Sequence, residues 1–473
     1  MNGSEPFRVL SAVNPGRVAV DVPWADPERV AASVADQPGT LWLDCADGSD
    51  WSYVLTDPMS VASVAEGLDP FANARAALQR LRTRRRSPAL DRLLPPFVGG
   101  LAGLFGYELG RRLEPSLATA PLPAGGPVLP ELWLGLYRDV VAFDPASRRV
   151  RVVCQPWGTG PTAAERAAVW RGRLEAARGA DLPPPEVPRG VLGRDRDATD
   201  YARLVEEVVD RIRAGEVYQA NLSQRFTLRP QGPLDPFGLY RRLRAVARPA
   251  RGAFLQLGEA GWVASASPER LVRVQNGHAE AAPIKGTRPR GAEPRADAAA
   301  LAALRASPKD RAENVMIVDL LRNDLSRVCA DGSIGVPALC APVTLPTVHH
   351  LVSRVTGRAR PGVGPFDVIS ALFPGGSITG APKVQAMRVI AELEPTRRGP
   401  YCGSIGWVGA NGDLDLNIGI RTACPHADGQ VAFCAGGGVV FDSSPQGEEA
   451  ETRVKAKAFA EAVGQPPPWE PGS

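Results

Sequence analysis

Short apolar runs separated by turn-forming residues occur along much of the chain, and this pattern predicts many short strands. Residues 39–58 contain two such runs around a turn-rich interruption, which predicts a strand pair with a long connection. Residues 132–143 and 150–155 predict two further strands, joined by a turn at residues 144–146.

Two segments have the spacing or composition of helices. Between residues 201 and 212, apolar side chains recur at steps of three and four, which predicts an amphipathic helix that ends before Gly215. Residues 163–180 are rich in Arg and Glu and predict a surface helix. The alternating pattern of residues 218–226 predicts a strand directly after the first helix. Long helices between strand pairs, with few strand–helix–strand repeats, favour an α+β fold.

Residues 181–188 lie between the two predicted helices and contain four prolines. Proline has no amide hydrogen and a restricted backbone, so this stretch cannot form a helix or a central strand. It is therefore the best linker candidate in the chain. We divide the chain into an N-terminal region at 1–180, a linker at 181–195 and a second region at 196–465.

The composition is that of an ordinary folded protein of 473 residues, with 44% hydrophobic residues, 22% charged residues and a net charge of +4. This balance gives no reason to expect binding to nucleic acid or to a membrane surface. No run approaches the ~20 apolar residues of a membrane span, and residues 1–13 lack the segments of a signal peptide. The seven cysteines form no Cys-x-x-Cys pair, which argues against a disulfide framework and a zinc site. We expect a cytoplasmic protein with reduced cysteines.

Lys285 lies in the segment PIKGTRPRG at residues 283–291, between a rigid proline and a permissive glycine. The proline restricts the backbone before the lysine, and Gly286 lets the backbone approach a ligand closely. A lysine partly removed from water loses part of its preference for the charged form and becomes an amine nucleophile. The alternative interpretation is a solvated lysine in a turn.

Three further motifs accompany this lysine in a defined order: SASPER at 265–270, ENVMIVDLLRND at 313–324 and GAPK at 380–383. With PIKGT, this set resembles the chorismate-utilising enzymes over roughly residues 196–460. The resemblance implies two large, mainly antiparallel β-sheets packed face to face, with helices outside. It also implies that chorismate is the substrate.

The residue at position 285 distinguishes branches of this family. Aminodeoxychorismate synthases have Lys there and anthranilate synthases have Ala, so the resemblance favours conversion of chorismate to 4-amino-4-deoxychorismate, the precursor of p-aminobenzoate, through a covalent lysine intermediate. Isochorismate and salicylate synthases place a water-activating lysine near Gln219, and a glutamine cannot act as that base. An anthranilate synthase is the first alternative. A non-catalytic subunit that binds chorismate or tryptophan is the second.

Two predicted helices carry carboxylates that suit a cation. One has Asp310 and Glu313 near its start, and the other has Glu448 and Glu451 three residues apart on one face. The alternative for the second helix is a solvated, self-paired surface. Mg²⁺ prefers oxygen ligands. Water molecules and a carboxylate of the substrate would complete its coordination. The resemblance assigns these four residues to Mg²⁺.

The resemblance also assigns the rest of the site. Glu269 is expected to shuttle a proton, Ser377 stands where many relatives have Thr, and His350 lies near the leaving hydroxyl, although a lone histidine is more often structural. The guanidinium of Arg421 suits the enolpyruvyl carboxylate, and glycines at 436–438 would admit backbone amides to it. The expected catalytic residues are Lys285, Glu269, Ser377 and His350. The expected substrate-binding residues are Tyr401, Arg421, Gly286, Thr287, Gly436, Gly437, Gly438 and Lys455.

Neither a glutaminase nor its nucleophile is recognisable, because Cys434 lacks the first glycine of a Gly-x-Cys-x-Gly motif and no histidine follows it in the sequence. We therefore expect ammonia from a separate glutamine amidotransferase subunit. In the N-terminal region, Leu43, Asp44 and Cys45 fall where relatives border a tryptophan effector pocket, but Cys45 replaces the usual Ser. The alternative for this segment is plain strand packing.

Overall fold

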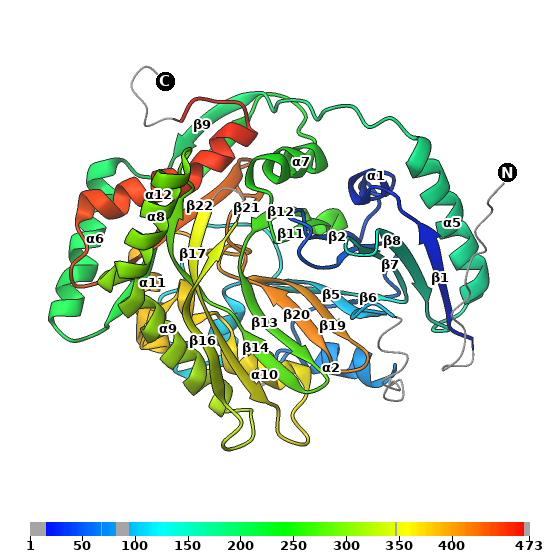
Figure 1. The fold of residues 1–473 in the computed structure, drawn as a ribbon, viewed down its shortest axis with the longest axis horizontal. Helices are drawn as coiled ribbons and strands as arrows, with labels where there is room; N and C mark the ends of the chain where they lie inside the picture. Colours follow the sequence, from blue (N-terminus) through cyan, green and yellow to red (C-terminus); the bar gives the residue numbers. More distant parts are fainter. Residues whose placement is uncertain (1–15, 68, 82–93, 346–347, 468–473) are drawn as a thin grey trace.

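The computed structural model describes residues 16–67, 69–81, 94–345 and 348–467 (Figure 1). These residues form two large β-sheets with helices on their outer faces. Every ladder between the named strands is antiparallel. The expected α+β fold with two mainly antiparallel sheets is confirmed.

The first sheet has twelve strands, of which β9 (Gly190–Arg194) pairs with β10 beside the main order. The main order is β1 (Val18–Pro23), β8 (Arg149–Cys154), β7 (Asp139–Asp144), β3 (Ser52–Leu55), β2 (Thr40–Asp44), β11 (Arg251–Gln256), β12 (Trp262–Ser267), β21 (Thr422–Pro425), β22 (Val431–Val439), β10 (Gln219–Pro230) and β18 (Gly380–Ala381).

The second sheet has ten strands, of which β16 (Gly335–Thr344) pairs with β17 beside the main order. The main order is β15 (Ile284–Pro289), β17 (Val348–Arg358), β14 (His278–Ala281), β13 (Arg270–Gln275), β20 (Leu414–Asn417), β19 (Ser404–Gly409), β5 (Gly100–Phe105), β6 (Leu132–Tyr137) and β4 (Val61–Ala62).

Helices cover the outer faces of both sheets (Figure 1). The α-helices are α1 (Pro27–Ala32), α2 (Ala72–Gln79), α4 (Leu109–Leu113), α5 (Ala163–Gly179), α6 (Ala198–Arg213), α7 (Pro236–Ala247), α8 (Pro294–Ala306), α9 (Pro308–Ser326), α10 (Pro365–Leu372), α11 (Lys383–Leu393) and α12 (Pro445–Ala462). Three short 3-10 helices are η1 (Pro115–Leu117), η2 (Gly258–Ala260) and η3 (Gly376–Ile378).

Alternation along the strands builds the core between the sheets. On β2, the buried Leu41 and Leu43 belong to a hydrophobic cluster that also contains Leu104 of β5 and other residues of the second sheet. Trp42, between them, points to the opposite face and packs its ring edge-on against Tyr240 of α7. Because neighbouring strand residues face opposite ways, one strand serves both the inter-sheet core and the helical layer.

Segments from both halves of the chain share each sheet. β2 from the N-terminal half pairs with β11 from the second half, and β5 pairs in the same way with β19. The proline-rich residues 181–189 form neither helix nor strand, as predicted, whereas β9 begins at Gly190 inside the predicted linker. The regions on either side of 181–195 are therefore interleaved in the fold.

Several local predictions are confirmed and one is wrong. The structure contains the predicted β2–β3 pair and helices α5 and α6. The run at 132–143 was predicted as one strand, but it forms β6 in one sheet and β7 in the other. The chain crosses between sheets at Arg138, whose carbonyl accepts a hydrogen bond from the amide of Gln155. An unbroken apolar run does not reveal such a crossing.

Candidate active site

Lys285 lies on β15 at a bulge. The register of β15 against β17 shifts between Lys285 and Thr287, and Gly286 between them has a positive φ of 75°. A Cβ atom at Gly286 would lie 2.9 Å from the Cβ of Asp310 on α9. Only glycine accommodates both that backbone conformation and that close approach. The bulge therefore sets the direction of the neighbouring lysine.

Ser377 of η3 joins the lysine to a carboxyl group. The Nζ atom of Lys285 donates a hydrogen bond to the backbone carbonyl of Ser377 at 3.2 Å. The Ser377 hydroxyl donates to Oε1 of Glu269 at 2.9 Å. The side-chain amide of Asn221 on β10 donates to the same Ser377 carbonyl at 2.6 Å. Residues from four separate segments thus converge at one turn.

Burial pushes Lys285 and Glu269 toward their neutral forms. It lowers the pKa of Lys285 below its ordinary value, although the carboxylates of Glu313 and Glu269 oppose this shift. It raises the pKa of Glu269, although the nearby Lys285 and the Ser377 hydroxyl oppose that shift. A neutral amine is a nucleophile and a neutral carboxyl is a proton donor. The two groups are thus suited to act together.

His350 and Thr287 lie across the β15–β17 ladder from each other. The Nδ1 atom of His350 contacts the Thr287 hydroxyl at 2.8 Å. Burial lowers the pKa of His350, and the charge of Arg421 lowers it further. The imidazole therefore favours its neutral form near pH 7.

Arg421 directly precedes β21 with a left-handed backbone, φ 52°, a conformation that concentrates at functional positions in proteins. Burial lowers the pKa of its guanidinium, and Glu269 opposes the shift. Among the described residues, no ion pair to Arg421 occurs. A largely buried cation without a carboxylate partner suits an anionic ligand. Tyr401, also predicted to contact substrate, is buried, with 8% of its surface exposed.

Glu448, at the start of α12, has one oxygen without a partner. Its Oε1 atom accepts a hydrogen bond from the Ser443 hydroxyl at 2.6 Å, whereas its buried Oε2 atom has no hydrogen-bond partner among the described residues. A Cβ atom at Gly437 would lie 2.7 Å from that Oε2 atom and 3.5 Å from an oxygen of Glu451. Gly437 therefore leaves space beside both carboxylates, whose oxygen atoms are the type of ligand that Mg²⁺ prefers.

The remaining predicted metal ligands differ in their partners. Burial raises the pKa of Glu313 on α9, with the negative charges of Asp310 and Glu451 adding to that shift. Glu451 pairs with Lys455 at 2.7 Å, and Asp310 pairs with Arg288 at 2.9 Å. In the described ranges, no group of three or more His, Cys, Asp or Glu residues is placed so that it could hold a metal ion. The negative charge of Glu451 acts on both Glu313 and Glu448, so these carboxylates lie near one another, whereas Asp310 and Glu451 each already have a cationic partner.

The glycines at 436–438 lie on β22, paired with β10 in the register Gly436 to Ser223 and Gly438 to Asn221. The Nζ atom of Lys455 donates to the carbonyl of Gly436 at 2.7 Å. A Cβ atom at Gly438 would lie 2.7 Å from the Asn221 side-chain oxygen. These glycines therefore make room for side chains of the site.

Sequence reasoning missed Asn221. It lies two residues after Gln219 on the same strand, and the Gln219 side chain donates to its Oδ1 atom at 3.1 Å. The strand period of two places both side chains on one face, so the strand prediction contained this signal. Its bond to Ser377 depends on a contact across 156 residues of sequence.

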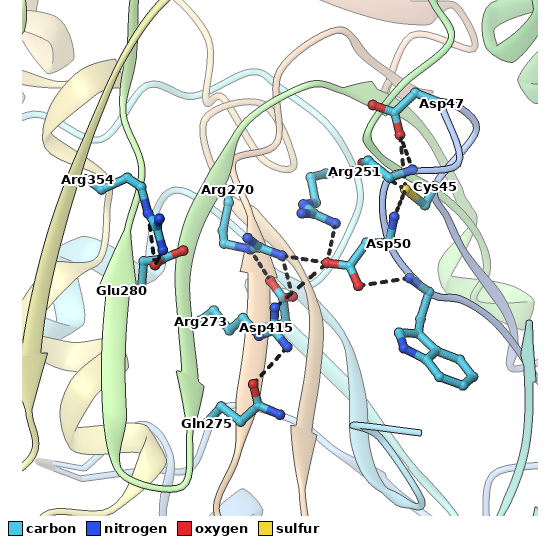
Figure 2. Close-up of polar contacts among 12 residues, drawn as sticks. Cys45, Asp47, Asp50, Arg251, Arg270, Arg273, Gln275, Glu280, Arg354 and Asp415 are labelled. Atoms are coloured by element: carbon cyan, nitrogen blue, oxygen red, sulfur yellow. Dashed lines mark hydrogen bonds and ion pairs between the residues drawn. The ribbon is translucent and has the colours of Figure 1, made fainter. Parts of the chain in front are cut away.

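The predicted effector segment borders a small pocket, open to solvent, that Leu43 and Asp44 help to line. Figure 2 shows the ion pairs beside it: Asp50 contacts Arg251 at 3.1 Å and Arg270 at 3.0 Å. The Cys45 thiol does not line the pocket but donates to the Asp47 carboxylate, and burial raises the pKa of this thiol to about 12. The segment thus both packs in strand β2 and lines the pocket. Tryptophan binding stays a prediction.

Two predictions about the whole chain have partial answers. All seven cysteines are free thiols, as expected. In the part of the chain that the structure describes, no helix has the length and apolar character needed to cross a membrane. The expectation for residues 1–13 lies outside the described residues.

Similar proteins match both the motifs and the fold. Aminodeoxychorismate synthase component 1 of Klebsiella aerogenes is 41% identical over 359 residues, which cover 76% of this chain and 75% of that protein. Anthranilate synthase component 1 of Mycobacterium bovis is 34% identical over 501 residues and covers 97% of this chain and 95% of its own length. The crystal structure of anthranilate synthase component I from Streptococcus pneumoniae superposes with a TM-score of 0.75 at 29% identity, covering 87% of this chain and 92% of that chain.

The family model described as chorismate binding enzyme matches residues 38–461, which extend well into both halves of the chain. That range contains every strand of the two sheets except β1, and all of the predicted site residues. The chain therefore belongs to the chorismate binding enzyme family.

Proposed function

We propose that this chain is the chorismate-aminating component of an aminodeoxychorismate synthase, which converts chorismate and ammonia to 4-amino-4-deoxychorismate for p-aminobenzoate formation. One observation carries the proposal: the amine of Lys285 lies at the turn whose Ser377 hydroxyl binds Glu269. The relative with 41% identity is named for this activity, which supports the assignment.

The reaction begins with an attack by the neutral Nζ atom of Lys285 on C2 of the chorismate ring. The two ring double bonds shift, and the bond between C4 and its hydroxyl oxygen breaks. Glu269 donates a proton, so that the hydroxyl leaves as water. Burial favours the required neutral form of both residues, as their pKa shifts indicate.

Ammonia then attacks C4 from within the site. The double bonds shift back, and the C2–Nζ bond breaks to release the Lys285 amine. Two successive displacements thus place nitrogen at the carbon that carried the hydroxyl, and a direct attack on C2 would not. The lysine is regenerated for the next turnover.

Several groups hold the substrate during these steps. Arg421, which lacks a carboxylate partner in the described residues, binds the enolpyruvyl carboxylate together with Tyr401. Glu313, Glu448 and Glu451 would hold Mg²⁺, which supplies positive charge to neutralise the ring carboxylate of chorismate. The neutral His350 lies beside Thr287 and adds a polar group to the pocket wall.

Ammonia comes from a separate glutamine amidotransferase subunit in the proposed enzyme. The relatives carry the designation component 1, which supports a two-component system. The sequence contains no glutaminase motif. The proposed enzyme acts in the cytoplasm, and the seven free cysteines support this location.

Anthranilate synthase is the second candidate, favoured by the relative that aligns over 97% of this chain. That reaction uses the same pocket but delivers nitrogen to C2. Lys285 separates the two, because a covalent lysine step is needed only for amination at C4.

Product analysis of Lys285→Ala tests the proposal. The unaltered chain with chorismate, Mg²⁺ and an ammonium salt should form 4-amino-4-deoxychorismate. The variant should lose this product and direct residual activity to 2-aminated species, because ammonia then reaches C2 itself. Anthranilate from the unaltered chain would establish the second candidate. Lack of any aminated product, with a folded chain and an active partner subunit, would favour a non-catalytic role.

A further inference from the structure

A buried ion pair between Arg398 and Glu394 lies directly behind the candidate site. Arg398 has 4% of its surface exposed and Glu394 has 7%. The Nε atom of Arg398 donates to one carboxylate oxygen of Glu394 at 2.8 Å, and its Nη2 atom donates to the other at 2.7 Å. Such a two-point pair fixes the plane of the guanidinium.

The remaining donors of Arg398 bind two walls of the site. Its Nη1 atom donates to the carbonyl of Ile378 in η3 at 3.1 Å, and its Nη2 atom donates to the carbonyl of Asn221 on β10 at 2.7 Å. Glu394 binds β10 as well, because it accepts hydrogen bonds from the amide and hydroxyl of Ser223 at 2.9 and 2.7 Å. The pair therefore clamps β10 to the turn that carries Ser377.

Two aromatic rings flank the same guanidinium. The Cζ atom of Arg398 lies 4.8 Å from the ring centroid of Tyr107 and 5.6 Å from that of Tyr401. Cations at this distance attract the face of an aromatic ring. The backbone amide of Arg398 also donates to the buried carboxylate of Glu108 at 2.7 Å, which anchors the segment that leads to Tyr401.

We propose that Arg398 is a positioning residue that sets the places of Ser377 and Tyr401 without touching the substrate, and this inference rests on the proposed function. Ser377 accepts a hydrogen bond from Lys285 and donates one to Glu269. A shift of the η3 turn therefore moves the nucleophile and the proton donor together. Lysine cannot replace this role, since a single ammonium group cannot span both carbonyls and both carboxylate oxygens.

The experiment compares Arg398→Lys with a matched variant, Arg166→Lys. Arg166 also binds a carboxylate at two points, Asp139 at 3.0 and 2.9 Å, and also donates to backbone carbonyls. It lies on α5, outside the site. Each variant is assayed for kcat and KM with chorismate, Mg²⁺ and ammonium salt, for the ratio of 4-aminated to 2-aminated product, and for thermal unfolding.

Both variants should unfold at lower temperature. Arg398→Lys should lower kcat by about tenfold or more, because small misplacements of reacting groups are that costly. It should also lower the ratio of 4-aminated to 2-aminated product, a readout that does not depend on the amount of folded enzyme. Arg166→Lys should leave both quantities within about twofold of the unaltered chain.

The double variant Arg398→Met with Glu394→Met removes both buried charges and covers the case in which Arg398→Lys fails to fold. It should show the same losses. An unchanged kcat and product ratio in a folded Arg398 variant would overturn the inference. If the unaltered chain forms only anthranilate, the proposed function fails, and kcat alone still decides the role of Arg398.

Discussion

The backbone carbonyl of Ser377 accepts a hydrogen bond from the amine of Lys285 at 3.2 Å, although 92 residues separate them in sequence. The hydroxyl of the same serine donates to Glu269. One residue of a short turn therefore holds the nucleophile through its backbone and the proton donor through its side chain. A substitution at Ser377 can therefore remove the hydroxyl that binds Glu269 and keep the backbone carbonyl that binds Lys285.

Ser377→Ala should lower activity by up to about a hundredfold, the lower end of what a general acid or base contributes, because the carboxyl is misoriented and not removed. The alanine keeps the carbonyl that binds Lys285 but loses the donor to Glu269, so the carboxyl loses its orientation. Ser377→Thr keeps a hydroxyl and should retain most activity. Steady-state rates of amination for the two variants provide the test, and equal activity of Ser377→Ala and the unaltered chain would exclude a role for the hydroxyl.

The rate of adduct formation on Lys285 without ammonia should be bell-shaped in pH. Burial lowers the pKa of Lys285 below its ordinary value and raises that of Glu269 above its ordinary value, so each limb should be shifted from the pKa of the free group. As the pH increases, the rate rises when the amine of Lys285 loses its proton and falls when the carboxyl of Glu269 loses its proton. The two apparent pKa values belong to the coupled pair and not to either residue alone. Single-turnover measurements check this. Glu269→Gln should abolish one limb, and retention of both limbs would assign the proton donor elsewhere.

Activity should require Mg²⁺ and Glu448, whose Oε2 atom has no hydrogen-bond partner among the described residues. Glu448→Gln should lower activity by more than about a hundredfold, because even groups around a metal's direct ligands contribute about tenfold to a hundredfold. The neighbouring Glu449 offers a matched control, since it is buried but pairs with Arg194 at 3.1 Å and Arg453 at 3.0 Å. Glu449→Gln should lower the unfolding temperature and leave the Mg²⁺ concentration for half-maximal activity unchanged. Full activity in excess chelator would show that the reaction does not require Mg²⁺.

Glutamine alone should support no turnover by the isolated chain, whereas ammonium salts at high pH should. Free NH₃ is the nucleophile, and its share of total ammonium rises with pH. Addition of a cognate amidotransferase should make glutamine effective. Hydrolysis of glutamine by the isolated chain, followed by glutamate release, would reveal a glutaminase site in this sequence.

The sequence predicted the local elements of the site well, because their signals lie within a few residues. Ser444 caps α12 by accepting a hydrogen bond from Gly447, and Pro445 begins the helix. The helical spacing therefore placed Glu448 and Glu451 on one face. The alternation at 218–226 also predicted the strand at 219–230. The segment of Lys285 was singled out for its chemistry, but its strand at 284–289 was not predicted.

The relations between distant elements were beyond sequence patterns. Nothing near Glu448 indicates that Gly437 leaves space beside its Oε2 atom, because that contact depends on how α12 packs on β22. Asp310 was expected among the metal ligands by its place on α9, yet it pairs with Arg288 of β15. No sequence pattern indicated a role for Arg398, because its partners come from elements far apart in the chain.

The most direct test of the central claim is the mass of the peptide that carries Lys285. The chain is incubated with chorismate and Mg²⁺ without ammonia, then digested and analysed by mass spectrometry. Lys383 is the control, since it is also largely buried but its amine pairs with the Asp324 carboxylate at 2.7 Å. We expect a chorismate-derived mass on the Lys285 peptide but not on the Lys383 peptide. Added ammonia should remove this mass as 4-amino-4-deoxychorismate forms. An unmodified Lys285 peptide during active turnover to 4-amino-4-deoxychorismate would contradict the covalent role of the lysine.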